Sequence, residues 1–179
     1  MRANAAANRE RILDAAAEVF GKQGSAGSTE EVARRAKVGI GTVFRHFPTK
    51  ADLIEAALLR HFEQLAGQIA TNLQADGPQH ALFATITMMV ETGATKLSMA
   101  SLLPDGSFPP AVRQASDEVR AMVAALLARA AREGNVRDDI SVDEVYLLIR
   151  ALAQTSALTR PDPKTLDASI QILLKGLQR

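Results

Sequence analysis

The sequence predicts an all-α protein, and three features of its 179 residues support this fold class. Hydrophobic residues make up 47% of the chain and alanine is abundant, a composition typical of helical proteins. Apolar residues recur at helical spacing, whereas alternating runs rich in Val, Ile and Thr are missing. Three predicted helix starts carry a capping box, a Ser or Thr followed three residues later by an acid, at Ser28, Thr49 and Ser141, and Asp162 before Pro163 is expected to cap the last helix. We expect about nine helices.

The first helix is predicted from Ala7 to about Gly21. Its apolar residues lie at i, i+1, i+4, i+7 and i+8 and therefore share one face: Ile12, Leu13, Ala16, Val19 and Phe20. Gly21 and Gly24 are plausible ends for this helix. We expect its apolar face to pack against the helices that follow.

Two short helices joined by a tight turn are predicted next. Ser28, with Glu31 three residues on, opens a helix that continues to about Ala36. The second helix begins near Ile40 and must end at Phe47, because Pro48 disfavours a helical conformation in the residue before it. The turn of three residues between them contains a glycine, so residues 28–47 are predicted to form a helix-turn-helix.

The charge around this motif indicates a nucleic-acid partner. No acidic residue occurs between Val32 and Ala51, and this window holds five basic side chains: Arg34, Arg35, Lys37, Arg45 and Lys50. The net charge of the whole chain is only +1, so the local distribution carries the argument. The alternative is a solvated basic face with no partner.

The arm from Met1 to Asn8 contains Arg2 and is expected to be a disordered tail. The alternative is that this arm contacts a phosphate or a minor groove.

The run GIGTVFRHFPTK at residues 39–50 resembles the recognition-helix signature of TetR-type (TetR/AcrR family) bacterial transcriptional regulators. The resemblance extends upstream through the run RERILDAA at residues 9–16 and covers about the first third of the chain. Three positions depart from the usual pattern. Phe44 stands where a Tyr is usual, Gly39 where a Ser or Thr cap is common, and Ile40 where a polar residue is common.

The resemblance and the predicted helix faces together give the expected DNA-binding residues. Val43 and Phe47, at i and i+4, should pack inward and leave the opposite face free. The predicted contacts are Ser28, Ile40, Gly41, Thr42, Phe44, Arg45, His46 and Lys50. Arg45 pairs with a guanine edge or only with a phosphate, and the sequence does not separate these. Ser28 could be only a helix cap, and Phe44 only a packing residue.

The C-terminal half is predicted to be helical throughout. A break at Asp76-Gly77-Pro78 separates a helix starting at Lys50 from one that ends near Leu102. A loop at residues 103–110, one or two helices at 111–133 and two final helices at 141–158 and 162–177 complete the chain. We expect two domains, a DNA-binding domain at residues 6–66 and a second domain at 67–179.

The resemblance implies that the second domain forms a homodimer and binds a small effector. Apolar stripes on the last two helices are the predicted dimer interface: Leu148, Leu152, Leu166, Ile170, Leu173 and Leu177. From the sequence alone, the stripes fit equally well inside the core of one chain. Residues suited to an adaptable effector pocket are Met88, Met89, Thr92 and Arg150. The alternative is that the methionines and threonine belong to the core and the arginine to the surface.

Other classes of function find little support in the sequence. The chain has no cysteine, and its three histidines, His46, His61 and His80, are dispersed, so we expect no catalytic residue, metal or cofactor. No apolar run is long enough for a membrane span. We therefore expect a cytoplasmic, nucleoid-associated regulator that binds double-stranded DNA at a palindromic operator, represses transcription and is released by a small molecule. The alternative is a helical interaction protein that has lost specific DNA binding.

Overall fold

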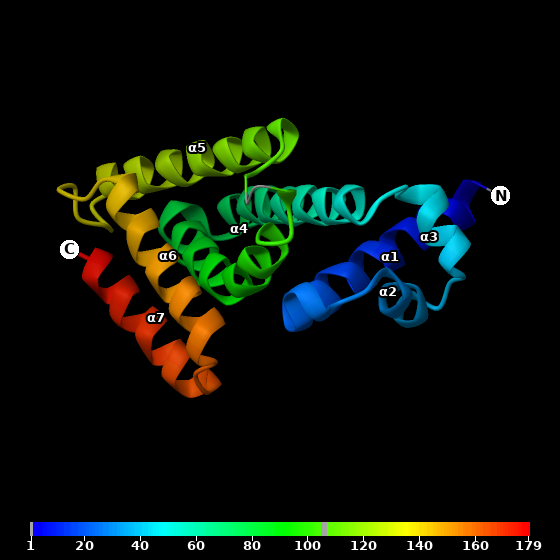
Figure 1. Cartoon of the computed structure of the whole chain (residues 1–179). Coiled ribbons are helices and arrows are strands. Elements are labelled where there is room, and N and C mark those ends of the chain that lie inside the picture. The colour runs from blue at the N-terminus through cyan, green and yellow to red at the C-terminus, as the bar shows by residue number, and fades with distance from the viewer. Residues whose placement is uncertain (1, 105–106) are drawn as a thin grey trace. The chain divides into compact units, whose positions relative to one another are not determined.

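The computed structural model describes residues 2–104 and 107–179 and shows an all-α chain (Figure 1). The described residues form seven α-helices, one short 3-10 helix and no strand beyond an isolated bridge between Val136 and Gln178. The elements are α1 (Arg2–Gln23), η1 (Gly24–Ala26), α2 (Thr29–Ala36), α3 (Ile40–His46), α4 (Lys50–Ala100), α5 (Pro110–Arg132), α6 (Val142–Thr159) and α7 (Pro163–Leu177). The predicted fold class is therefore confirmed. Of the predicted loop 103–110, Asp105 and Gly106 lie outside the described residues.

The helix starts agree well with the predicted caps. The Thr49 and Ser141 side chains each accept a hydrogen bond from the N–H three residues on, and Asp52 and Glu144 return the bond as complete capping boxes. Asp162 caps α7 in the same way, with a proline in the first turn. Local side-chain chemistry therefore sets these boundaries.

Helix α1 is longer than predicted. Helix α1 begins at Arg2, so the expected N-terminal tail is helical, in keeping with the high helix propensity of its alanines. It also continues past Gly21, and the left-handed residue that follows is Gly24, with φ of 54°. The region predicted to hold one or two helices at 111–133 forms one helix, Pro110–Arg132.

The expected break in α4 is present as a kink. Gly77 has φ of 83° and ψ of 177°, a conformation that an L side chain rarely adopts, and Pro78 follows it inside the element. The helical segments on either side of Gly77 correspond to the two helices predicted from Lys50 to about Leu102. This kink and the single helix α5 explain why the chain has fewer helical elements than the nine expected.

The chain packs into two units, Met1–His61 with Thr95–Arg113 and Phe62–Ala94 with Gln114–Arg179. In the first unit Ile12, Phe20 and Val43 are fully buried, so α1 and α3 share one core. In the second unit α4 and α6 pack closely, since a Cβ added at Gly93 would lie 2.5 Å from Cβ of Ala153. Residues 95–113 were expected in the second domain but pack with the first unit. The division into residues 6–66 and 67–179 stays a prediction.

Candidate nucleic-acid interface

Helix α2 begins after its cap Ser28, and the turn between α2 and α3 consists of residues 37–39. Ser28 caps α2, with its Oγ accepting a hydrogen bond from the N–H of Glu31 at 3.1 Å. The expected return bond from Glu31 is not formed, because the Glu31 carboxylate pairs with Arg34 instead, at 2.6 Å. The left-handed residue of the turn is Lys37, with φ of 56°, whereas Gly39 is extended and precedes α3. The two helices and their turn thus have the predicted helix-turn-helix form.

Helix α3 has one buried and one exposed face. Val43 is fully buried and Phe47 is 5% exposed, as the spacing predicted. Ile40 is 38% exposed and Phe44 is 44% exposed, so both large apolar side chains face solvent. On the same helix Gly41 and Arg45 are also exposed, while Thr42 and His46 are half-buried. Most of the predicted contacts therefore lie together on the free surface of one short helix.

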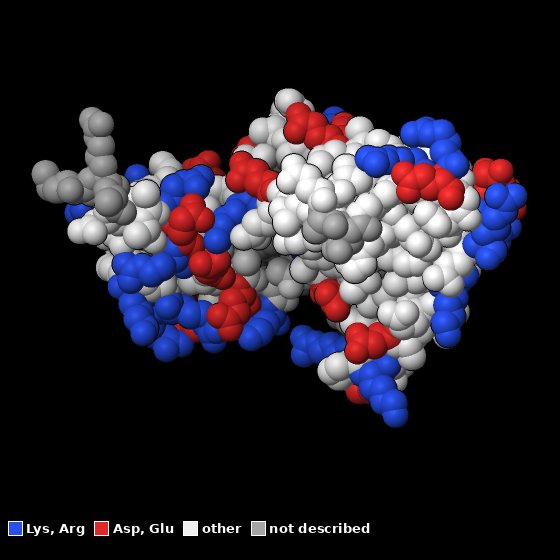
Figure 2. All heavy atoms as spheres, turned by 180° about the vertical axis from the view of Figure 1, so that it is seen from behind, with Lys and Arg blue, Asp and Glu red and all other residues white. Residues whose placement is uncertain are grey.

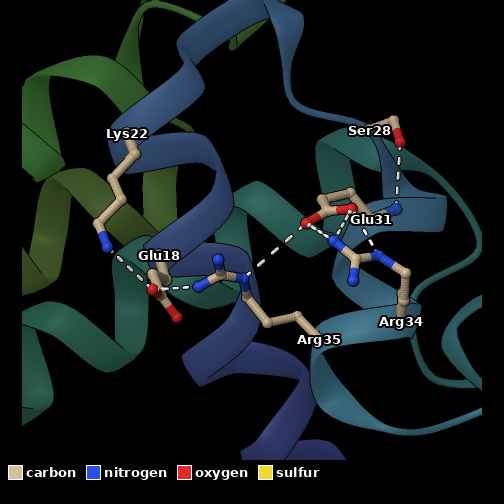
Figure 3. Close-up of polar contacts among 6 residues, drawn as sticks. All are labelled: Glu18, Lys22, Ser28, Glu31, Arg34 and Arg35. Atoms are coloured by element: carbon tan, nitrogen blue, oxygen red, sulfur yellow. Dashed lines mark hydrogen bonds and ion pairs between the residues drawn. The ribbon is translucent and has the colours of Figure 1, made fainter.

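Two of the five basic residues in the acid-free window are tied to acids outside it. Arg34 binds Glu31 through Nε and Nη2, and Arg35 lies between Glu31 and Glu18 of α1 (Figure 3). Hydrogen bonds from Lys22 and Arg35 hold the pKa of the Glu18 carboxyl below its usual value. This network fastens α2 to α1. A window of sequence cannot reveal such pairing, because Glu18 is far from Arg35 along the chain.

Lys50 also has a partner within the chain. Its ammonium donates a hydrogen bond to the backbone oxygen of Gly27 at 2.7 Å and lies 5.0 Å from the centre of the Phe20 ring. The same side chain therefore joins the start of α4 to α1 and to the loop before α2. A lysine has three N–H donors, so two remain beyond the one that Gly27 accepts. Its role as a phosphate contact stays a prediction.

Lys37 and Arg45 are the exposed cations of the window for which the described residues supply no hydrogen bond or ion pair. Elsewhere acids and bases are interleaved, and the face in Figure 2 shows red and blue side chains next to each other. The positive charge available to a nucleic acid at α3 is therefore local and small. Arg9 of α1 lies 5.7 Å from the centre of the Phe47 ring, a contact that the sequence did not suggest.

The predicted dimer residues divide between core and surface. Ile170, Leu173 and Leu177 of α7 are buried within the chain, while Leu148 of α6 is 47% exposed. A groove of about 740 Å³ between α6 and α7 is lined by Leu148, Leu152, Leu173 and Leu177 among others. Three further apolar residues on these helices are exposed and were not predicted as interface residues: Leu147, Leu158 and Ile172. The sequence of α6 and α7 contains this information, since apolar residues occur on more than one face of each helix.

The predicted effector residues do not lie together on a described pocket. Met88, Met89 and Thr92 are half-buried on α4, where the Thr92 hydroxyl donates to the Met88 carbonyl, and Arg150 is exposed on α6. A different pocket, of about 370 Å³, lies between α4 and α5. Its lining is mostly apolar and includes two arginines: Ile69, Ala70, Leu73, Met122, Ala125, Leu126, Arg129 and Arg132.

A helix-turn-helix whose second helix exposes its outer face defines a class of DNA-binding proteins. Comparison with known proteins narrows this class. Residues 12–57 match the family model for bacterial regulatory proteins of the tetR family, and residues 77–179 match the C-terminal domain of SbtR-like transcriptional regulators. The chain belongs to the TetR family and is a DNA-binding transcriptional regulator.

Individual relatives agree along nearly the whole chain. The TetR transcription regulatory protein from Mycobacterium vanbaalenii is 32% identical, with a TM-score of 0.80 and 99% of both chains covered. The regulator SCO0520 from Streptomyces coelicolor is 32% identical, with a TM-score of 0.80, and the match covers 95% of this chain and 98% of that one. The transcriptional repressor KstR of Mycolicibacterium smegmatis is 27% identical, and the match covers 93% of this chain and 86% of the repressor.

Proposed function

We propose that this regulator binds a palindromic operator as a homodimer, represses transcription and is released by a small molecule. The observation that carries the proposal is the exposed outer face of α3, which holds Ile40, Gly41, Phe44 and Arg45. The proposed contacts in each half-site are Ser28, Ile40, Gly41, Thr42, Phe44, Arg45, His46 and Lys50. KstR, a relative over most of the chain, is named as a repressor. We propose that the protein acts at the nucleoid and has no catalytic activity. None of the described helices is long and apolar enough to cross a membrane.

Capture of sheared genomic DNA tests the proposal directly. The purified protein is incubated with DNA of its own organism at low and at moderate salt, and the retained fragments are sequenced. We expect a palindromic site that is still enriched at moderate salt, because base contacts specify a sequence and phosphate contacts do not. Retention only at low salt, without a shared motif, would contradict specific binding. Retention of nothing would favour the interaction-protein alternative.

We place the dimer interface on α6 and α7. The groove between these helices, together with exposed Leu147, Leu148 and Ile172, supports this placement, because exposed apolar clusters of this kind mark association surfaces. A single helix-turn-helix contacts few base pairs, so a symmetric pair is needed to specify a site. Ile170 and Leu177 then support the interface from inside the chain.

A charge introduced on this surface is expected to separate the subunits. We expect Leu148→Glu to convert a dimer to a monomer in sedimentation-velocity runs and to weaken operator binding, because each monomer retains only one recognition helix. Its helical content should remain, since the side chain is 47% exposed. The control Arg45→Ala should remain dimeric and lose only DNA affinity. A Leu148→Glu protein that sediments as a dimer would place the interface elsewhere.

For the effector we propose the pocket between α4 and α5. Its apolar wall and its volume suit a small organic molecule. Arg132 has no hydrogen bond or ion pair to the described residues, and Arg129 shares its charge with Glu133 at 3.2 Å. The lining therefore fits an apolar ligand with an anionic end. The set Met88, Met89, Thr92 and Arg150 stays a prediction for the same role.

The proposed ligand class is tested by adding straight-chain carboxylates, or alcohols of the same chain length, to the protein. We expect the carboxylates to raise the melting temperature and to release DNA, and the alcohols to do neither. Arg132→Gln should weaken carboxylate binding by about 10-fold or more, since a hydrogen bond to a charged group contributes about 1.5–3 kcal/mol. Arg113→Gln, on the same helix but outside the pocket, is the control. Equal responses to both ligand series would show that no anionic end is recognised.

A further inference from the structure

The exposed face of α3 is more apolar than a surface helix requires. Ile40 and Phe44 are four residues apart, so their side chains lie on the same side of the helix. They are 38% and 44% exposed and are the large apolar residues of the helix that the chain's core does not use. Val43 and Phe47 fill that core instead. The pair is therefore available to a partner.

Gly41 follows Ile40 on the exposed side of the helix, and its lack of a side chain leaves the backbone accessible there. A Cβ added there would meet no atom within 4 Å, and its φ is not in the left-handed range. The fold therefore does not require a glycine at this position, although a glycine inside a helix is less stable than an alanine. The surface at Gly41 is therefore open to a partner.

The charge around the pair decides which kind of partner this is. The window from Val32 to Ala51 has no acidic residue, and in the sequence the cations Lys37 and Arg45 stand on either side of the pair, without a hydrogen bond or ion pair to the described residues. An exposed apolar pair on a segment with unpaired cations and no acid is complementary to DNA. In the major groove, the apolar group that a base pair presents is the C5-methyl of thymine.

We propose that Ile40 and Phe44 read thymine methyl groups in each operator half-site, with Gly41 giving the bases room to approach. The inference rests on the proposed function, since it requires α3 to lie in the major groove. It assigns sequence specificity at these positions to apolar contact, whereas Arg45 contributes charge and hydrogen bonding. The operator should therefore carry thymine where α3 begins.

Replacing thymine by deoxyuridine tests the proposal, because it removes only the methyl group. Each thymine of the captured operator is replaced in both half-sites, one symmetric position at a time. We expect one or two positions at which the wild-type protein loses about 10-fold or more in affinity, given about 4-fold for each buried methyl. The double variant Ile40→Ala/Phe44→Ala should bind more weakly and be insensitive to the same replacements. Tolerance of every replacement within 2-fold by the wild type, or unchanged sensitivity in the double variant, would overturn the inference.

Gly41→Ala gives an independent test with a matched control. The added methyl meets nothing in the chain, so we expect the stability to hold or rise. Operator affinity should fall by about 5-fold or more, because the methyl keeps the bases from approaching and one thymine-methyl contact of about 4-fold is lost at each half-site. Gly67 of α4 is also exposed, and a Cβ added there would likewise meet no atom within 4 Å. Gly67→Ala should therefore leave DNA binding unchanged. Equal affinities for the two alanine variants would contradict the proposed approach of DNA at Gly41. If no operator is captured at all, the proposed function itself fails.

Discussion

Replacement of Phe20 by alanine is expected to destabilise the N-terminal unit by about 3–5 kcal/mol, the usual loss for a buried phenylalanine. The Phe20 ring is fully buried, and the Lys50 ammonium lies 5.0 Å from its centre. Loss of the ring removes apolar contacts and also the cation–π contact with the Lys50 ammonium. Helix α1 and the start of α4 would then lose a shared anchor.

Hydrogen exchange and urea denaturation measure this effect. In Phe20→Ala, amides of α1, α2 and α3 should exchange faster than in the wild type, while those of α6 and α7 keep their protection. Phe44→Ala is the matched control, because the same substitution at a residue that is 44% exposed should cost about 0.5 kcal/mol or less. Similar losses in the two variants would mean that Phe20 does not anchor the unit.

Arg45→Ala is expected to weaken operator binding by about 30-fold or more in the dimer. A bidentate pair with a base contributes about 1–3 kcal/mol, and each dimer carries two copies of the residue. The fold should be unchanged, because Arg45 is exposed and makes no hydrogen bond or ion pair with the described residues. Fluorescence anisotropy on the captured operator measures the loss.

Two comparisons complete this experiment: the affinity of Arg45→Ala for random DNA, and the operator affinity of the control variant Arg34→Ala. If Arg45 reads a guanine, affinity for the operator should fall far more than affinity for random DNA. An equal fall on both would assign Arg45 to a phosphate. Arg34→Ala is the control, since the Arg34 charge is already paired with Glu31 at 2.6 Å. If Arg34→Ala lost operator affinity and Arg45→Ala did not, Arg34 would be the DNA contact and Arg45 would not.

Much of the fold could be predicted from the sequence, because its signals are local. The caps at Thr49, Ser141 and Asp162 depend on residues within one helical turn, and the structure confirms all three. The helical start at Arg2 was missed, since weak local signals favoured a tail. The left-handed turn residue was also unexpected, because Lys37 takes a conformation in which glycine is more common.

The candidate site was less predictable where it depends on distant residues. The exposed face of α3 followed from the spacing of Val43 and Phe47. In contrast, the bond from Lys50 to Gly27 joins residues 23 positions apart. The pairing of Arg35 with Glu18 similarly depends on how α1 meets α2. No pattern within one segment contains that information.

The pairing of Arg34 and Arg35 has a consequence for the thermodynamics of DNA binding. A protein displaces roughly one condensed counterion from DNA for each phosphate that a cation neutralises, and this release makes the affinity depend on ionic strength. Arginines that already neutralise Glu18 and Glu31 displace few such ions. The affinity of this regulator should therefore change only gently with ionic strength. Discrimination between sites should then depend mainly on the contacts that α3 makes with the bases.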